Sequence, residues 1–249
     1  MRKPLLAGNW KMYKNAGETK AFFEKFLPLV AASTHADIVI CPTFINIPAA
    51  VEATETSRVE IGAQNLYWKN EGAFTGEVSG PMILAAGAKW VIIGHSERRQ
   101  FFGETDATVL QRTQAALACG LKPIVCVGEL LAEREAGETE LVLKTQFEGG
   151  IAPLTPEQFA QVTIAYEPVW AIGTGKTATP EIAADAHRAL RGLVTAKFGS
   201  DAGAATRILY GGSVKPDNVK GLMAQPEIDG ALVGGASLEA ASFSGIVNF

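Results

Sequence analysis

The sequence has few of the residues that bind metals or form disulfide bonds. Its three histidines, His35, His95 and His187, are far apart in the chain, and none has a neighbour at the spacing of metal ligands. The three cysteines are an odd number, are widely spaced and lie in apolar segments, which favours buried reduced thiols over a disulfide framework. We therefore expect no metal site.

Long apolar runs and blocks of positive charge are also missing. No segment approaches the ~20 apolar residues of a membrane-spanning helix, and the apolar run near the N-terminus is too short for a signal peptide. The net charge is −4 and no Lys/Arg block suggests a nucleic-acid or anionic membrane surface. These absences predict a cytoplasmic protein whose partner is a small molecule, not a nucleic acid or a membrane.

A repeat of short and long segments runs along the whole chain. Its 249 residues, 47% of them hydrophobic, permit one large α/β domain or two small ones. The short runs are continuously apolar, which is typical of parallel strands covered by helices. Eight such runs occur, at 4–10, 36–42, 59–65, 89–96, 122–129, 162–168, 206–213 and 229–236.

The segments between these runs carry helix signals. Asn15 and Glu18 have the spacing of a capping box, and Thr179 followed by Pro180 is a typical helix start. A doubly wound open sheet that binds a dinucleotide would need G-x-G-x-x-G after its first strand, where this chain has AGNWKM. No linker interrupts the repeat, so the sequence predicts a single (β/α)8 barrel domain over residues 1–249.

In such barrels the chemistry lies at the C-terminal ends of the strands. Lys11 in GNWKM is either a solvated surface charge or an ammonium group that bulky neighbours aim at the barrel mouth, where it suits a phosphate or an enolate oxygen. His95 in IIGHSERR is either a core residue or a catalyst. The segment SERRQFF predicts a short helix after it, whose N-terminus disfavours imidazolium and leaves a neutral ring that can polarise a carbonyl.

Glu167 ends the sixth run and is either half of a structural ion pair or a base. Pro168 directs the chain out of the strand, and the apolar, glycine-containing loop over 168–176 is typical of a closing lid. GTGKT resembles the end of a nucleotide-binding loop, but Trp170 stands where that motif has its first glycine, and the helix signal at Thr179 comes too late. We therefore favour a base under a lid.

Glycines follow the last two runs. Gly211-Gly212-Ser213 and Gly234-Gly235 are each compatible with an ordinary turn. However, barrels that bind phosphate do so after the seventh and eighth strands, where bare backbone N–H groups can face the anion. The position of both pairs therefore favours a phosphate site.

Five motifs resemble those of one family, the triosephosphate isomerases, in order and spacing. The resemblance extends over essentially the whole chain, although Leu130 departs from the threonine expected in the family at a peripheral position. The motifs are GNWKM (8–12), IIGHSERR (92–99), AYEPVWAIGTGK (165–176), YGGSV (210–214) and VGGASL (233–238).

The resemblance implies a glycolytic and gluconeogenic isomerase that interconverts dihydroxyacetone phosphate and D-glyceraldehyde 3-phosphate through an enediolate, without a cofactor. It makes Glu167 the base and His95 the neutral electrophile. It also makes Lys11, with Asn9 beside it, the group that stabilises the enediolate. The implied phosphate contacts are Gly173 of the lid, Ser213, Gly234 and Gly235.

The loop over 65–79 contains Tyr67, Trp68 and Phe74 and is either a packed surface loop or an interface. In the family the equivalent loop reaches into a partner subunit, and the residue matching Thr75 approaches the neighbour's active site. The resemblance therefore implies a homodimer.

Two other classes of function stay open. Another phosphate-binding barrel enzyme would share the two glycine pairs but should show a Schiff-base lysine or metal-binding histidines at the strand ends. A non-catalytic binding barrel would have no need of Lys11, His95 and Glu167 together.

Overall fold

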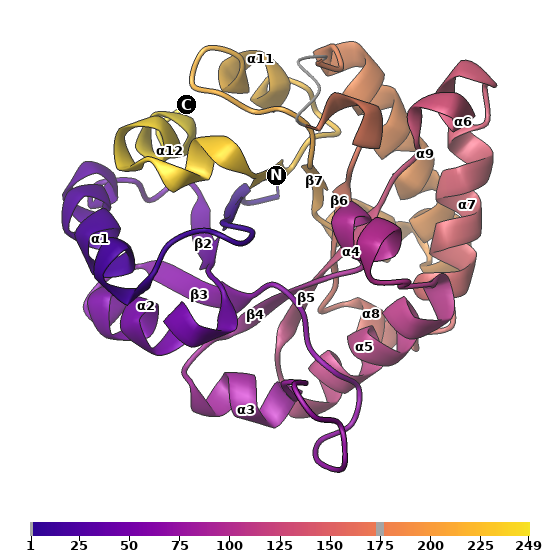
Figure 1. Ribbon diagram of the computed structural model, residues 1–249. Helices are drawn as coiled ribbons and strands as arrows, with labels where there is room; N and C mark the ends of the chain where they lie inside the picture. The colour runs from indigo at the N-terminus through magenta and orange to yellow at the C-terminus, as the bar shows by residue number, and fades with distance from the viewer. Residues whose placement is uncertain (1, 173–176) are drawn as a thin grey trace.

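The computed structural model describes residues 2–172 and 177–249. Its eight strands are all parallel and pair in sequence order into a closed barrel (Figure 1). Each strand lies within one of the eight predicted runs, so the predicted (β/α)8 barrel is confirmed. The strands are β1 (Leu5–Asn9), β2 (Asp37–Cys41), β3 (Val59–Ala63), β4 (Trp90–Ile93), β5 (Lys122–Val127), β6 (Thr163–Tyr166), β7 (Ile208–Tyr210) and β8 (Gly230–Val233).

Helices connect the strands and form a ring around the barrel (Figure 1). The α-helices are α1 (Ala16–Val30), α2 (Ile47–Thr54), α3 (Gly80–Ala85), α4 (Ser96–Phe101), α5 (Asp106–Cys119), α6 (Leu131–Glu135), α7 (Thr139–Gly150), α8 (Pro156–Phe159), α9 (Pro180–Phe198), α10 (Ser200–Ala205), α11 (Val219–Met223) and α12 (Ala240–Val247). Short 3₁₀ turns are η1 (Phe44–Asn46), η2 (Val169–Ala171) and η3 (Gly235–Leu238).

Local sequence signals set the N-termini of α1 and α9. The side chain of Asn15 accepts a hydrogen bond from Glu18 N and thereby caps α1. Thr179 caps α9 by accepting from Ile182 N, and Pro180 occupies the first turn. Because α9 begins only at Pro180, Thr177 precedes its first turn, and the geometry of a nucleotide-binding loop is excluded.

Successive strand residues fill two separate cores, which explains why the runs are continuously apolar. Leu5 and Ala7 point into the barrel and pack with Ile92, whereas Leu6 faces outward and packs with Phe23 under the helices. Both faces of each strand are therefore buried, as in other parallel barrels. The polar residues that end the runs lie beyond these cores, at the barrel mouth.

The cysteines are unpaired, as the sequence predicts. Cys41 and Cys126 are buried inside the barrel. Cys119 at the end of α5 is only half-buried, so the expectation of three buried thiols is wrong for this residue, whose Sγ lies against Gly80 of α3. Within residues 2–172 and 177–249, no helix has the length and hydropathy needed to cross a membrane.

Candidate active site

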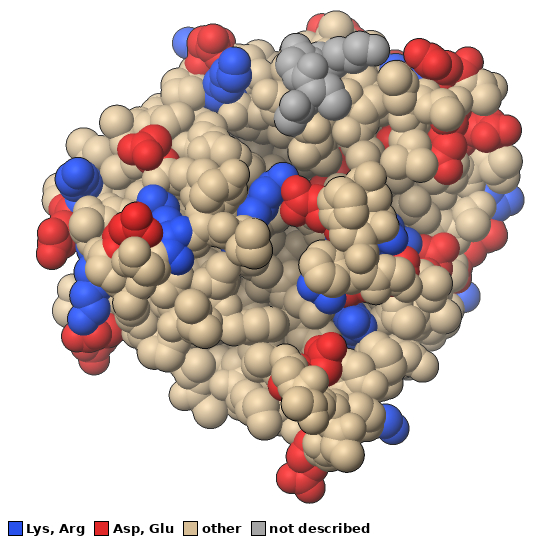
Figure 2. All heavy atoms as spheres, in the orientation of Figure 1, with Lys and Arg blue, Asp and Glu red and all other residues tan. Residues whose placement is uncertain are grey.

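A cavity of about 290 Å³ opens at the C-terminal ends of the strands. Figure 2 shows this face of the molecule hollowed at its centre, where basic and acidic atoms meet. The cavity brings together residues from five loops that are far apart in the sequence. Seven predicted site residues line it: Asn9, Lys11, His95, Glu167, Ser213, Gly234 and Gly235.

Lys11 faces the cavity from the loop after β1, as predicted. Its backbone is in the left-handed region, with φ at 49°, which is uncommon for a residue with a side chain. Asn9 Oδ1 accepts from Lys11 N at 3.0 Å, and Gln64 Nε2 donates to Lys11 O at 2.8 Å, so both neighbours hold this conformation. The predicted support from Met12 is wrong, because that side chain is 91% exposed.

The ammonium group of Lys11 is already paired. Its Nζ lies 2.6 Å from Glu97 Oε1, and neither side chain is fully buried. An anionic ligand in the cavity would therefore compete with Glu97 for this positive charge. Lys11 and Glu97 are 86 residues apart, so no local pattern in the sequence reveals their contact.

His95 is the N-cap residue of α4, which confirms that its ring lies at a helix N-terminus. Its Nδ1 accepts from Glu97 N at 3.2 Å, so the ring proton belongs on Nε2. Nε2 lies 2.9 Å from Glu167 Oε1. The ring is thus oriented from both sides, with its N–H directed at the carboxylate that lines the same cavity.

Glu167 is held on the wall of the cavity between β4 and β6. Ser96 N donates to Oε2 at 2.9 Å, and Ser96 Oγ donates to Oε1 at 3.3 Å. The side chain is only 2% exposed. These contacts give both carboxylate oxygens hydrogen-bond partners. Of the two readings of Glu167, the structure shows the ion-pair arrangement, and this arrangement places the carboxylate on the wall of the cavity.

His95 and Glu167 each shift the pKa of the other. Burial lowers the pKa of His95, but the Glu167 and Glu97 carboxylates raise it, and the net direction is upward. Burial raises the pKa of Glu167, whereas His95, the Ser96 N–H and Cys126 lower it, and the net direction is downward. The upward direction for His95 runs against the sequence-based expectation, because that expectation included the helix N-terminus but not the carboxylate at Nε2.

The loops after β7 and β8 form the adjoining wall of the cavity. Gly211 must lack a side chain, since a Cβ there would lie 2.9 Å from Glu167 Cγ and 3.0 Å from Tyr166 O. Gly234 O accepts from Ser237 Oγ at 2.7 Å, and Ser237 O accepts from Trp10 Nε1 at 3.0 Å. These two hydrogen bonds hold the turn at Gly234 against the loop that follows β1.

Sequence reasoning missed two contributors, Ser96 and Glu97. Both lie within the motif IIGHSERR, next to His95, but no pattern in the motif assigns them roles. Ser96 anchors Glu167, and Glu97 contacts both Lys11 and His95. The signal that could have found them is their position in the first turn of α4, whose N-terminus faces the barrel mouth.

Two further predicted site residues remain to be placed, Gly173 and Thr75. Gly173, with the lid segment 173–176, lies outside the described residues. The first part of the predicted lid is described: Ile172 lines the cavity, and Trp170 Nε1 donates to Glu129 Oε1 at 2.9 Å. Thr75 is exposed in the segment between β3 and α3, which projects away from the barrel (Figure 1).

A larger hollow of about 700 Å³ lies at the other end of the barrel, around the first residues of β2 to β5. Two of its carboxylates, those of Asp37 and Glu60, are already paired. Asp37 accepts from Arg207 at 2.8 Å, and Glu60 accepts from Trp90 Nε1 at 2.6 Å and from Lys89 at 3.0 Å. Because these groups bond to one another, this end of the barrel serves stability.

The fold and the site define a (β/α)8 barrel whose acid–base groups converge at the C-terminal strand ends. A family model described as triosephosphate isomerase matches residues 4–249. The chain belongs to the triosephosphate isomerase family.

Curated relatives agree over their full lengths. A triosephosphate isomerase of Solibacter usitatus is 70% identical over 249 residues, which are 100% of both chains. Those of Citrifermentans bemidjiense and Chloroflexus aurantiacus are 55% and 52% identical, covering all of this chain and 99% and 100% of theirs.

Proposed function

We propose that the protein interconverts dihydroxyacetone phosphate and D-glyceraldehyde 3-phosphate by proton transfer through an enediolate. The observation that carries this proposal is the convergence of a carboxylate, an imidazole and an ammonium group on one cavity whose adjoining wall is glycine-rich. Family membership and the names of the full-length relatives support it.

Each of the three groups has a role that its chemistry suits. A proton next to a carbonyl is weakly acidic, so a carboxylate must remove it while fixed donors stabilise the developing enolate. Glu167 is the base that moves the proton between C1 and C2. His95 donates its Nε2 proton to the carbonyl oxygens, and Lys11, with Asn9, stabilises the negative charge.

The phosphate group of the substrate occupies the side of the cavity formed after β7 and β8. Ser213, Gly234 and Gly235 bind it there, largely through backbone N–H groups, with Gly173 joining them from the lid. Residues 168–176 close over the substrate and exclude water. Exclusion is chemically necessary, because an enediolate beside a phosphate can expel that phosphate.

A coupled assay that converts glyceraldehyde 3-phosphate and detects dihydroxyacetone phosphate tests this function. We expect rapid isomerisation without added metal or cofactor. A protein that binds the triose phosphate without converting it would instead support a binding barrel. Conversion of other phosphorylated substrates only would support a different enzyme of this architecture.

His95→Gln tests the electrophile. We expect kcat to fall by about 10²-fold, the cost of losing one oriented donor to an enolate. We also expect the carbonyl band of bound dihydroxyacetone phosphate, measured by infrared difference spectroscopy, to move toward its position in free solution. His35→Gln is the control, because His35 makes an edge-to-face contact with Phe249 outside the cavity. An unchanged band in His95→Gln would contradict the role.

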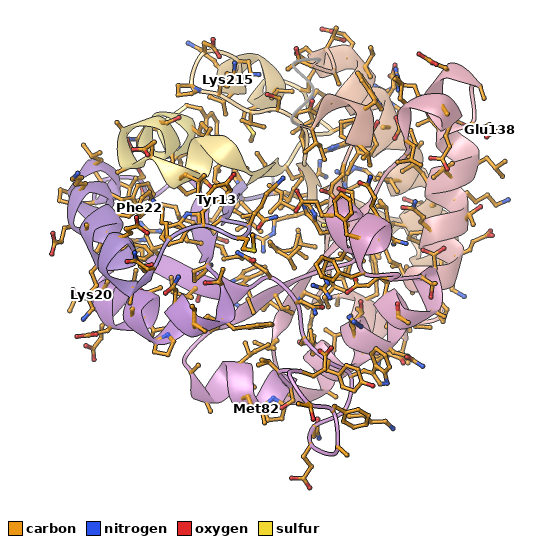
Figure 3. The ribbon with its side chains drawn as sticks, viewed as in Figure 1. Tyr13, Lys20, Phe22, Met82, Glu138 and Lys215 are labelled. Carbon is orange, nitrogen blue, oxygen red and sulfur yellow. The ribbon has the colours of Figure 1, made fainter. Side chains whose placement is uncertain are left out.

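The protein acts as a homodimer of single-domain chains in the cytoplasm, in keeping with a glycolytic role. Large apolar side chains are exposed, among them Met82 at 55% on α3, the helix that follows the projecting segment (Figure 3), and Ile45 at 83% on η1. A second cavity of about 270 Å³ lies next to Lys11 and His95, and Phe44 and Phe102 also line it. The projecting loop of a second copy, with Thr75 at its end, fills this cavity.

Sedimentation equilibrium tests this assembly. We expect a mass of about twice the 26.3 kDa of one chain. Thr75→Arg should weaken the dimer and lower activity in parallel, because it places a bulky charge in the partner's cavity, whereas Thr75→Ser should do neither. A fully active monomer at the concentration of the assay would refute the proposal.

A further inference from the structure

The backbone of Gly128, directly after β5, is bonded by a side chain of the outer helix ring. Gly128 N donates to Gln146 Oε1 at 2.8 Å, and Gln146 Nε2 donates to Gly128 O at 3.0 Å. Gln146 lies on α7 and is half-buried. The side-chain amide of Gln146 has an acceptor and a donor side by side. It therefore makes the two hydrogen bonds with the backbone of Gly128 that a neighbouring strand would otherwise make.

Gly128 lies against the backbone of Glu167. A Cβ on Gly128 would be 1.7 Å from Glu167 O, so the backbone at Gly128 is too close to the backbone of Glu167 to allow a side chain. Glu167 N also donates to Val127 O at 2.8 Å. The position of Gly128 therefore limits where the backbone of Glu167 can lie.

The next residue, Glu129, holds the start of the predicted lid. Its backbone O accepts from Val169 N at 3.1 Å. Its buried carboxylate accepts from Tyr166 Oη at 3.0 Å and from Trp170 Nε1 at 2.9 Å. Residues 128 and 129 are thus in contact with both the base and the described part of the lid.

We propose that Gln146 is a positioning residue for the base, acting on Glu167 through the backbone of Gly128. The inference rests on the proposed isomerase function. Gln146 does not line the substrate cavity. It is separated from the Glu167 carboxylate by a different cavity of about 270 Å³, which both residues line together with Ser96 and Leu130. A shift of Gly128 into this space would carry Glu167 away from Ser96 and from the substrate.

Gln146→Leu tests the role, because leucine has a similar size but leaves both polar groups of Gly128 without their partner. We expect kcat to fall at least tenfold, since a misplacement of about 1 Å at a reacting group costs up to about 10²-fold. We expect the dissociation constant of inorganic phosphate to stay within about twofold of wild type, because Gln146 does not line the substrate cavity.

The pH profile separates positioning from general destabilisation. If Glu167 loses contact with the Ser96 N–H and with His95, the groups that lower its pKa act less, and the acid limb of kcat/KM moves to higher pH. Loss of stability alone would lower the melting temperature without moving this limb. Gln146→Glu keeps one acceptor for Gly128 N and should show an intermediate loss.

Gln114→Leu is the matched control, an identical change at an exposed position of α5. It should leave kcat, KM and the pH profile unchanged. If Gln146→Leu does not fold, Gln146→Glu alone carries the test. Wild-type protein without isomerase activity would overturn the proposed function. An active wild type with kcat and an acid limb equal to those of the folded Gln146 variants would overturn only the positioning role.

Discussion

Glu167→Asp is expected to lower kcat by about 10²- to 10³-fold while the protein stays folded. The change keeps the negative charge but withdraws the carboxylate by one methylene from the substrate carbon. Because a base must reach its proton within hydrogen-bonding distance, the shorter side chain loses most of the base's contribution. Steady-state kinetics in both directions, together with the circular dichroism spectrum, checks this result.

The split between kcat and KM is informative for this variant. In the proposed mechanism Glu167 acts on the reacting carbons and does not bind the phosphate, so KM should change far less than kcat. Glu157→Asp is the control, since Glu157 is an exposed residue of α8. Turnover of Glu167→Asp at the wild-type rate would remove Glu167 from the role of base.

The barrel was predictable because its determinants are local. Asn15 and Thr179 cap their helices within three residues, and continuous apolar runs such as 36–42 already indicate burial on both faces. The strand ends were less predictable. In 89–96 the strand stops at Ile93, because Gly94 has a φ of 70° and His95 already caps α4.

The positions of the site residues were predictable from the barrel, but their partners were not. The rule that places chemistry at the C-terminal strand ends located Lys11, His95 and Glu167. The contact of Glu167 with Ser96 joins residues 71 apart in the chain, and the two ends of the Lys11 to Glu97 pair are separated further still. Such contacts depend on the relative rotation of neighbouring strands, which periodicity in one strand does not contain.

Protonation of His95 shows the consequence of these missing partners. The sequence indicates a ring at a helix N-terminus, which favours the neutral form of His95. The hydrogen bond that Nδ1 accepts from Glu97 N agrees with a neutral ring that carries its proton on Nε2. The carboxylate at Nε2 acts in the opposite direction. In the proposed mechanism Glu167 leaves His95 to reach the substrate, which would weaken this opposing influence and favour the neutral ring.

Lys11→Met is expected to lower kcat/KM on the order of 10³-fold, because it removes the positive charge that serves both the enediolate and the phosphate. The effect should appear in kcat and in the dissociation constant of inorganic phosphate, unlike that of Glu167→Asp. Kinetics and phosphate inhibition measure the two parts. The control is Lys20→Met on α1, whose ammonium pairs with exposed Glu52 on the protein surface (Figure 3).

The ion pair between Lys11 and Glu97 makes a second part of this prediction. Without Lys11, the Glu97 carboxylate is left beside the cavity, where it repels an anionic substrate. The double variant Lys11→Met with Glu97→Gln should therefore bind phosphate more tightly than Lys11→Met alone, and a double-mutant cycle gives the size of this coupling. Its kcat should stay low, because the amide restores no positive charge at the enediolate. A Lys11→Met enzyme within tenfold of wild type would contradict both parts, since neither the phosphate nor the enediolate would then depend on this ammonium group.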